Sequence, residues 1–319
     1  MGLIENPKTY TGRDLETIFF RPMFSGENAE QLGIRMLYNM PVPTTIQIWS
    51  PRADILQKYE TGWRGGNAAD RQQKTIELSK VKAEVGFSAS DYFQQVYEHI
   101  VASADVNLDD LTGTELEAAE TEMFRAAIAE SLRVTMWIGD TSATVYNKFD
   151  GFIKKIVNST ETQNVSLSGV SSLKDNILSI FNTLWTAASP ELKAMKGDGN
   201  LVFLVTSDVY DAYEQYLDSC GADAAYNDLS TGRRELSYHG IRVVDMGISH
   251  HLTGTRLPQS ICMLTDRRNL VLAVNTADYP GSEVRMWYNP DAMENRQRAI
   301  FMVGCEVLDE SLVVKANFE

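Results

Sequence analysis

Two stretches near the start of the chain alternate between apolar and polar residues, as strands do when one face is covered. Residues 44–49 alternate with a period of two, and residues 75–87 do so again. The residues between them, 60–73, are polar and rich in glycine, so we predict a long β-hairpin whose mobile tip projects from the body. In the second stretch the apolar positions change parity between Leu78 and Val81, which predicts a bulge or a change of face.

A long helical pattern follows the hairpin. Residues 115–138 carry apolar side chains at intervals of three and four, as an amphipathic helix does. Thr114 and Glu117 form a capping box at its start, and Gly139 provides a stop signal. At 1.5 Å per residue this helix would span roughly 36 Å, which is long for a globular domain. A second amphipathic helix is predicted over residues 172–188.

The rest of the chain is predicted to be mixed and then rich in strands. Residues 200–206 form a continuous apolar run, typical of a buried strand. Ser207 is predicted to cap the helix that follows and runs to about Ser219. Further strands are predicted at residues 240–245, 260–264, 269–274, 283–288, 298–307 and 311–318. This order of elements indicates the α+β class.

The first 42 residues have a different character. Short apolar pieces alternate there with prolines and glycines, which fragment regular structure. The segment nevertheless carries more aromatic side chains than a solvated tail should. We therefore expect an arm that packs against something else.

The charge narrows the possible functions. The chain has 319 residues, with 29 Lys and Arg against 43 Asp and Glu, so its formal net charge is −14. Such a balance argues against a protein that grips nucleic acid by its phosphates, and against adhesion to an anionic membrane. No stretch approaches the roughly 18 apolar residues of a membrane-spanning helix, and no signal peptide is visible. The three cysteines, Cys220, Cys262 and Cys305, are interpreted as buried reduced thiols of an intracellular protein.

The familiar motifs of catalysis and ligand binding are missing. His250 and His251 stand in a predicted loop, without Cys, His or carboxylate at a metal-ligand spacing around them. The glycine-rich residues 62–67 lack the Lys-Ser/Thr ending of a phosphate loop and precede a strand. The acidic residues within 105–110 do not match the register of an EF-hand. We therefore predict no catalytic, metal or cofactor site, and a structural or binding role.

The elements follow one another in a distinctive order over essentially the whole chain. The aromatic arm and the hairpin are followed by the long helix that ends in Gly139-Asp140. Five further segments follow: Asn147-Lys-Phe-Asp-Gly-Phe, Asn200-Leu-Val-Phe-Leu-Val-Thr-Ser-Asp-Val-Tyr-Asp-Ala-Tyr, Tyr238-His-Gly-Ile-Arg-Val-Val, Asn269-Leu-Val-Leu-Ala-Val and Gly304-Cys-Glu-Val-Leu-Asp-Glu-Ser-Leu-Val-Val-Lys-Ala. This order resembles that of the major capsid proteins of tailed bacteriophages, which have the Hong Kong 97-like fold.

The resemblance implies an α+β Hong Kong 97-like capsid fold with an N-terminal arm, an extended loop, a long spine helix, and peripheral and axial domains. The implied parts are the arm 1–42, the extended β-hairpin loop 43–89, the peripheral domain 90–160 with spine helix 115–138, the axial domain 161–280, and the return strands of the peripheral domain 281–319. The subunit would assemble in the host cytoplasm into hexamers and pentamers of an icosahedral head, and reside in the virion capsid.

The resemblance also implies the partners. They are other copies of the chain, with separate scaffolding, portal and decoration proteins, and packaged double-stranded DNA bound without sequence specificity. Because the chain enters the arm directly at Met1, a separate scaffold or none is expected. No membrane, no cofactor and no enzymatic activity are expected.

Exposed aromatic side chains and a hairpin without its own core are understandable if neighbouring subunits cover them. The candidate inter-subunit contacts are Phe19, Phe20 and Phe24 in the arm, and Trp63, Arg64 and Arg71 in the hairpin. Tryptophan and arginine are enriched among the residues that dominate interfaces. Trp63 can equally fold back on its own hairpin.

Two alternatives remain open at this point. The first is an encapsulin-type compartment shell, which has a similar fold but encloses a cargo protein. The second is a metal- or ligand-dependent soluble enzyme that uses His239, His250 and His251. The enzyme alternative predicts a small, discrete oligomer, whereas the capsid and encapsulin-type interpretations both predict very large assemblies.

Overall fold

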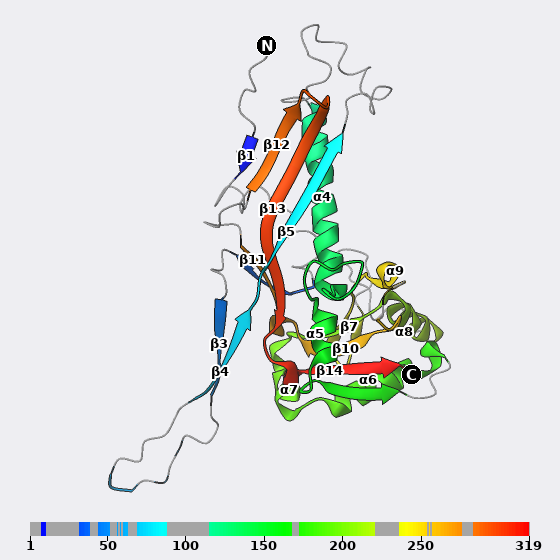
Figure 1. Ribbon diagram of the computed structural model, residues 1–319. Helices are drawn as coiled ribbons and strands as arrows, with labels where there is room; N and C mark the ends of the chain where they lie inside the picture. Colours follow the sequence, from blue (N-terminus) through cyan, green and yellow to red (C-terminus); the bar gives the residue numbers. More distant parts are fainter. Residues whose placement is uncertain are drawn as a thin grey trace.

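The computed structural model describes residues 8–10, 32–38, 44–51, 56, 58, 60–62, 69–87, 115–167, 172–220, 236–253, 255, 257–275 and 283–318. Over these residues the molecule is elongated. Helix α4 (Glu115–Ile138) and a long sheet form a limb, a wider body lies at one end of it, and a hairpin projects from the limb (Figure 1).

The sheet of the limb has six strands, and β13 lies at its centre. The strands are β1 (Lys8–Tyr10), β2 (Arg35–Tyr38), β5 (Ser79–Phe87), β11 (Leu270–Asn275), β12 (Glu283–Asn289) and β13 (Glu294–Val307). Strands β12 and β11 pair with successive parts of β13, residues 294–300 and 302–307. Strand β5 pairs with residues 295–303 of β13. Since β12 occupies one side of the same residues, β5 lies on the other side.

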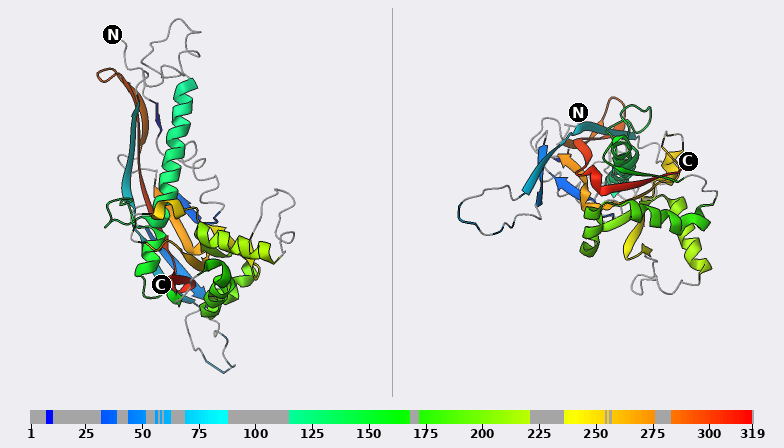
Figure 2. Two further views of the ribbon diagram at one scale, coloured as in Figure 1. Left: turned by 90° about the vertical axis from the view of Figure 1, so that its right-hand side faces the viewer. Right: turned by 90° about the horizontal axis from the view of Figure 1, so that it is seen from below.

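Helix α4 covers one face of this sheet. Alternate residues of β13, namely Ala299, Phe301 and Val303, share a buried cluster with Phe124 and Ile128 of the helix. The left view of Figure 2 shows the helix running along one face of the sheet. The bounds of α4 agree with the predicted helix at 115–138. The period of 3.6 in the helix and of 2 in the strand thus bring their apolar sides together.

The wider body contains a second six-stranded sheet. Its strands, in spatial order, are β6 (Gln163–Leu167), β14 (Val313–Phe318), β10 (Cys262–Asp266), β7 (Leu201–Val205), β9 (Ile241–Asp245) and β8 (Ser237–Tyr238). Helix α5 (Phe152–Asn158) packs against α4 and β13 of the limb, and the α-helices of the body are α6 (Leu173–Ala187), α7 (Pro190–Ala194), α8 (Ser207–Ser219) and α9 (Ser249–Leu252). The described residues also form three short 3₁₀ turns: Met195–Asp198, Arg267–Asn269 and Glu310–Leu312.

Strand β7 is buried on both faces. Phe203 and its alternate neighbours pack with α6 and α8, whereas Val202 and Leu204 belong to the cluster that also contains α4 and α5. The continuous apolar run predicted at 200–206 therefore has a simple cause, because buried apolar clusters lie on both sides of the strand. Through β7 the limb and the body share buried contacts.

The hairpin differs from the prediction in two respects. Residues 69–73, predicted as part of the polar loop, belong to strand β4 (Ala69–Ile76). Residues 75–87 do not form one strand: β4 (Ala69–Ile76) pairs with β3 (Thr44–Pro51), and β5 pairs with β13. The parity change between Leu78 and Val81 lies next to this switch of partners. The chain leaves the two-stranded hairpin at residue 77 and enters the limb at residue 79.

Three further observations concern the predicted parts of the chain and one predicted helix cap. Strand β14 pairs with β6 and β10 in the body, so residues 281–319 do not return to the limb as one unit. Strand β11 lies within residues 161–280, the predicted axial domain. In the structure it pairs with β13 and so belongs to the limb. Both sheets bury apolar strands, so strand composition did not distinguish them. Ser207 does not cap α8, because Thr206 occupies the cap position and the Ser207 hydroxyl donates to Asp245 at 2.8 Å.

Candidate assembly interface: the projecting hairpin and its anchor

Strands β3 and β4 form a separate two-stranded sheet that projects from the limb (Figure 1). Burial decreases from its base towards its tip. Ile76, the last residue of β4, is 1% exposed, whereas Leu56 is 88% exposed. Lys58 and Glu60 are exposed as well. Of the hairpin side chains that the structure describes, only Ile76 is buried, so the hairpin has no core of its own.

The base of the hairpin is held by apolar packing and by a close crossing of two chain segments. Ile76 packs against Val271 and Ala273 of β11 in a small separate cluster. Just beyond it, the backbone of Glu77 crosses β13 at Gly304. A Cβ atom at position 304 would overlap the carbonyl oxygen of Glu77. This crossing therefore requires glycine and fixes where the hairpin leaves the sheet.

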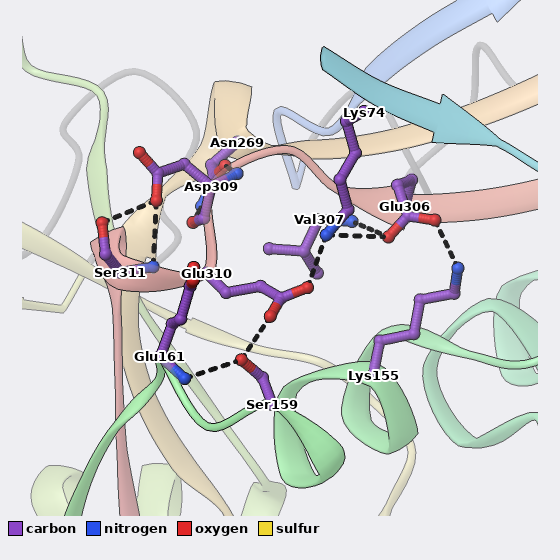
Figure 3. A network of polar contacts seen from close by, with 10 residues as sticks. All are labelled: Lys74, Lys155, Ser159, Glu161, Asn269, Glu306, Val307, Asp309, Glu310 and Ser311. Atoms are coloured by element: carbon purple, nitrogen blue, oxygen red, sulfur yellow. Dashed lines mark hydrogen bonds and ion pairs between the residues drawn. The ribbon is translucent and has the colours of Figure 1, made fainter. Parts of the chain in front are cut away.

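A network of charged side chains surrounds the same base (Figure 3). The Lys74 ammonium donates to Glu310 at 2.6 Å and lies 3.8 Å from Glu306. Lys155 of α5 donates to the other carboxylate oxygen of Glu306 at 2.5 Å. The Ser159 hydroxyl donates to Glu310. The side chain of Glu306 is only 7% exposed, and two lysines balance the two carboxylates. The hairpin is thus tied ionically to two other elements.

The charges in this network stabilise one another. Burial opposes the charged form of Lys74, but its hydrogen bond to Glu310 and the charges of Glu306 and Glu310 outweigh burial and raise the Lys74 pKa. Burial likewise opposes ionisation of Glu310, but the hydrogen bonds from Lys74 and Ser159 lower its pKa. Both groups are therefore charged at neutral pH, as an ionic anchor requires.

The two glutamates are presented by the segment that leads from the limb to the body. Asn269 holds this segment in place, since its side-chain amide donates to the Asp309 carbonyl at 2.7 Å and accepts from the Asp309 amide at 2.8 Å. The Asp309 carboxylate accepts from the amide and the hydroxyl of Ser311 at 3.0 and 2.6 Å. Hairpin, α5 and the crossover between the two sheets therefore meet at one junction.

A second junction links α4 to the body. Arg133 pairs with Glu130 at 2.6 Å on the same helix, and donates to the Gly247 carbonyl at 2.9 Å. The hydrogen bond from Arg133 lowers the Glu130 pKa. Tyr146 and His251 are joined by a hydrogen bond of 3.0 Å, and the other ring nitrogen of His251 lies 3.5 Å from Glu130. His251 thus contributes to a contact between α9 and α4.

The segment Asn147-Lys-Phe-Asp-Gly-Phe has a structural role after α4. Phe149 and Phe152 are buried in the cluster that α4 shares with the sheet. Lys154 forms ion pairs with Asp140 at 2.7 Å and Asp150 at 2.6 Å, closing the loop between them. The hydrogen bond from Lys154 is the largest cause of the lowered Asp140 pKa. The loop is thereby held against the end of the helix.

The predicted contact residues lie mostly outside the described part of the chain. Those outside it are Phe19, Phe20, Phe24, Trp63 and Arg64. Arg71 lies in β4, opposite Trp49 of β3. All six remain predictions. The sequence reasoning missed Leu56 and the anchor at Lys74, although the position of Leu56 in a polar stretch of the hairpin was a usable signal.

The remaining candidates for chemistry do not converge in the described residues. No group of three or more His, Cys, Asp or Glu there could hold a metal ion. His239 has a positive φ of 51° in the turn between β8 and β9. Cys262 and Cys305 are buried, which raises the pKa of both thiols, whereas Cys220 is exposed and not buried as predicted. No helix in the described residues is long and apolar enough to span a membrane.

Comparisons with solved structures identify the fold. No protein-family model and no curated protein sequence matches the chain. A chain of the satellite phage P4 procapsid matches with a TM-score of 0.57 and 10% identity, covering 94% of this chain and 98% of that one. The capsid of an empty GTA particle matches with a TM-score of 0.54 and 13% identity, covering 92% of this chain and 90% of that one. The capsid of Myoviridae phage XM1 matches with a TM-score of 0.53 and 13% identity, covering 100% of this chain and 95% of that one. The predicted α+β Hong Kong 97-like fold is confirmed.

Proposed function

We propose that this chain, which has the fold of phage capsid proteins, is a major capsid protein. Copies of the chain would assemble into hexamers and pentamers of an icosahedral head that encloses double-stranded DNA. The proposed location is the capsid of the virion, after assembly in the host cytoplasm. The proposed role is structural and involves no catalysis.

One observation carries this proposal. Capsid subunits match the chain over nearly its whole length, so the limb, the body and the hairpin all belong to the likeness. The hairpin also makes physical sense only with neighbours, because an isolated two-stranded hairpin is marginally stable in water. Here it is anchored firmly at its base and carries exposed Leu56 beyond the strands. Such a projecting hairpin fits a subunit whose neighbours cover it.

We further propose that the limb is the peripheral domain and the body is the axial domain at the capsomer centre. The limb then comprises α4 with its sheet, including β11, and the body comprises the second sheet with α6 and α8, including β14. The junction of Lys74 with Glu306 lies where these two parts meet the extended loop. It would set the angle at which the loop reaches a neighbour.

The net charge of −14 fits a wall that encloses DNA without gripping it. We propose that DNA is retained by confinement and not by sequence-specific contacts. Scaffolding, portal and decoration proteins are proposed as separate partners. Lysine substitutions on the inner surface of shells would test this, because packaging should slow as the wall attracts phosphates.

Microscopy of the purified protein tests the main proposal. We expect capsomers and closed shells in negative stain, with light scattering giving multiples of the 35.7 kDa subunit far above a small oligomer. A chain that stays monomeric, even when co-expressed with the neighbouring genes of its genome, would overturn the proposal. Shells that enclose a co-expressed protein and exclude DNA would favour the encapsulin-type alternative.

A shortened hairpin gives a sharper version of this experiment. Replacing residues 52–68 by an Asn-Gly turn joins β3 to β4 directly and keeps the anchor at the base. We expect an unchanged circular dichroism spectrum and the loss of assembly. Normal shells from this variant would contradict the assembly role of the hairpin, and global unfolding would contradict its description as a projection.

A further inference from the structure

Strand β14 carries a lysine in the middle of the body sheet. Lys315 is only 9% exposed, whereas lysines are almost never fully buried unless they are paired. Its neighbours in the strand, Val314 and Ala316, pack in the cluster that contains α6 and α8. Because side chains alternate along a strand, the Lys315 side chain points to the opposite face of the sheet. A charged group in such a place needs a partner, since burying an unpaired charge is unfavourable.

The described residues of the chain do not provide this partner. Among them, the Lys315 ammonium has neither a hydrogen bond nor an ion pair. Burial lowers the Lys315 pKa, and no neighbouring charge counteracts this effect. Lys74 and Lys155, in contrast, are each paired with a glutamate. The charge of Lys315 is therefore not compensated within the described part of the subunit.

The ammonium of Lys315 can nevertheless be reached from outside. The fully enclosed side-chain atoms that lack a hydrogen bond do not include its Nζ atom, so this atom keeps contact with solvent. On one side of Lys315 the register places Met263 of β10, which is buried. On the other side it places Asn164 of the edge strand β6, which is exposed. Lys315 thus lies at the boundary between an apolar and a polar part of the same face.

The polar part of this face is rich in hydrogen-bonding groups. Ser166 and Asn317 lie two positions further along β6 and β14, on the same side as Asn164 and Lys315. The four residues offer hydroxyl, amide and ammonium donors, and none of them is a carboxylate. The face therefore combines a positive charge with donors, which is the chemistry that recognises an anion.

We infer that Lys315 and Asn164 bind an anionic oxygen group, a phosphate or a carboxylate, on the face of the body sheet opposite α6 and α8. The ammonium supplies charge-assisted hydrogen bonds, and the amide group of Asn164 supplies a further donor. The group comes either from a free anion or from an acidic side chain of a second copy. This inference goes beyond the proposed function and does not depend on it.

Thermal unfolding in phosphate tests the site. The melting temperature of the unassembled chain is measured at pH 7 in sodium phosphate and in sodium chloride of equal ionic strength. Phosphate stabilises folded proteins in general, so the quantity compared is the difference between variants. We expect phosphate to raise the melting temperature of the wild type by at least about 2 °C more than that of Lys315→Met. Equal responses of the two chains would overturn the inference.

The variants also have expected behaviour in chloride. Lys315→Met keeps the packing of the side chain and removes an unpaired charge, so its melting temperature should equal or exceed that of the wild type. A large decrease would show that Lys315 has a partner within the chain, and would contradict the inference. Lys82→Met is the matched control, since Lys82 is exposed and already paired with Glu84. It should respond to phosphate as the wild type does.

A second variant tests the other side of the site. Asn164→Ala should weaken the apparent affinity for phosphate about tenfold, because one hydrogen bond to a charged group is lost. Its melting temperature in chloride should be unchanged, since Asn164 is exposed. An unchanged affinity would overturn the assignment of Asn164 to the site.

Assembly distinguishes the two sources of the anionic group. If a second copy supplies a carboxylate, assembled shells should lose the additional response to phosphate, and Lys315→Met should raise the protein concentration needed for assembly about tenfold. If the anion is free, shells should keep the response and the two chains should assemble equally. A chain that responds to phosphate but never assembles would contradict the capsid proposal and leave the anion site supported.

The acidity of the chain makes this test specific. With a net charge of −14, the surface as a whole repels anions. A response that depends on one lysine therefore reports the local arrangement of charge and donors around Lys315.

Discussion

Strands β7 and β4 are held in very different ways. All five residues of β7 are buried, and its two faces belong to the two large apolar clusters of the molecule. In β4 the described side chains are exposed or half-buried up to Ile76, its last residue. The neighbours of β7 all come from its own chain. The outer part of β4 has β3 as its partner strand. We propose that a second subunit supplies its remaining neighbours.

The difference shows that stability and assembly are located in different parts of this chain. The free energy of unfolding comes mainly from the buried strands and helices of the body and limb. The hairpin adds little to it, but its anchor determines where it points. Substitutions should therefore separate into those that unfold the subunit, those that loosen the anchor, and those that the unassembled subunit tolerates.

The largest effect is expected in the body. Phe203→Ala removes a fully buried ring that lies tilted against Phe181, with centroids 4.9 Å apart, and leaves a cavity in the core beside β7. The free energy of unfolding should fall by about 3–5 kcal/mol, as measured by urea denaturation. Leu56→Ala should leave it unchanged, because that side chain is exposed. Similar losses at the two positions would contradict the contrast between body and hairpin.

The next largest effect is expected at the crossing of the hairpin over β13. Gly304→Ala places a methyl group against the carbonyl oxygen of Glu77, so the two segments must separate. We expect a loss of about 1–3 kcal/mol, with faster hydrogen exchange at the end of β4 than in β7. Gly197→Ala is the control, since open space surrounds Gly197 and its loss should be negligible. Unchanged exchange in β4 would show that Gly304 does not hold the hairpin.

The elements held by local interactions were predictable from sequence. The bounds of α4 follow from its apolar period and from the stop at Gly139, and α6 begins after Ser172, whose hydroxyl accepts from the Asp175 amide as predicted. Strand β7 was also predicted, because burial on both faces leaves a continuous apolar run. These signals lie within a few residues of the structure they produce.

The pairing of strands and the anchor were not predictable in the same way. Whether β14 joins the limb or the body depends on contacts with β6 and β10, which are distant in sequence. Lys74 and Glu306 are likewise far apart in the chain, and neither has a distinctive local pattern. The parity change at Leu78 indicated that something happens there, but not that β5 would pair with β13.

A smaller effect is expected when the ionic anchor is removed. Lys74→Met leaves Glu306 paired with Lys155, but deprives Glu310 of its lysine. We expect a loss of about 1 kcal/mol at pH 7. The Glu310 pKa is lowered in the folded protein, so its contribution is present above the unfolded pKa of about 4.3 and is lost as pH falls through the folded value. The difference between variant and wild type should therefore vanish in acid.

The raised Lys74 pKa gives the opposite dependence at high pH. Its contribution is present below the unfolded pKa of about 10.4 and is lost as pH rises through the folded value. The contribution of the anchor to the free energy of unfolding should thus be constant between about pH 5 and 10. Lys82→Met is the matched control, since Lys82 forms an exposed pair with Glu84 at 2.7 Å. A loss for Lys82→Met equal to that for Lys74→Met would mean that the anchor is no stronger than a surface pair.

The smallest effect is expected within the hairpin itself. Thr75 of β4 lies opposite Thr45 of β3, with their hydroxyl oxygens 3.4 Å apart and both residues exposed. Such cross-strand pairs contribute only a few tenths of a kcal/mol, so Thr75→Ala should lower the free energy of unfolding by less than about 0.5 kcal/mol. Urea denaturation of the unassembled subunit measures this. A loss above about 1.5 kcal/mol would mean that the hairpin unfolds together with β7, and that the two regions are one cooperative unit.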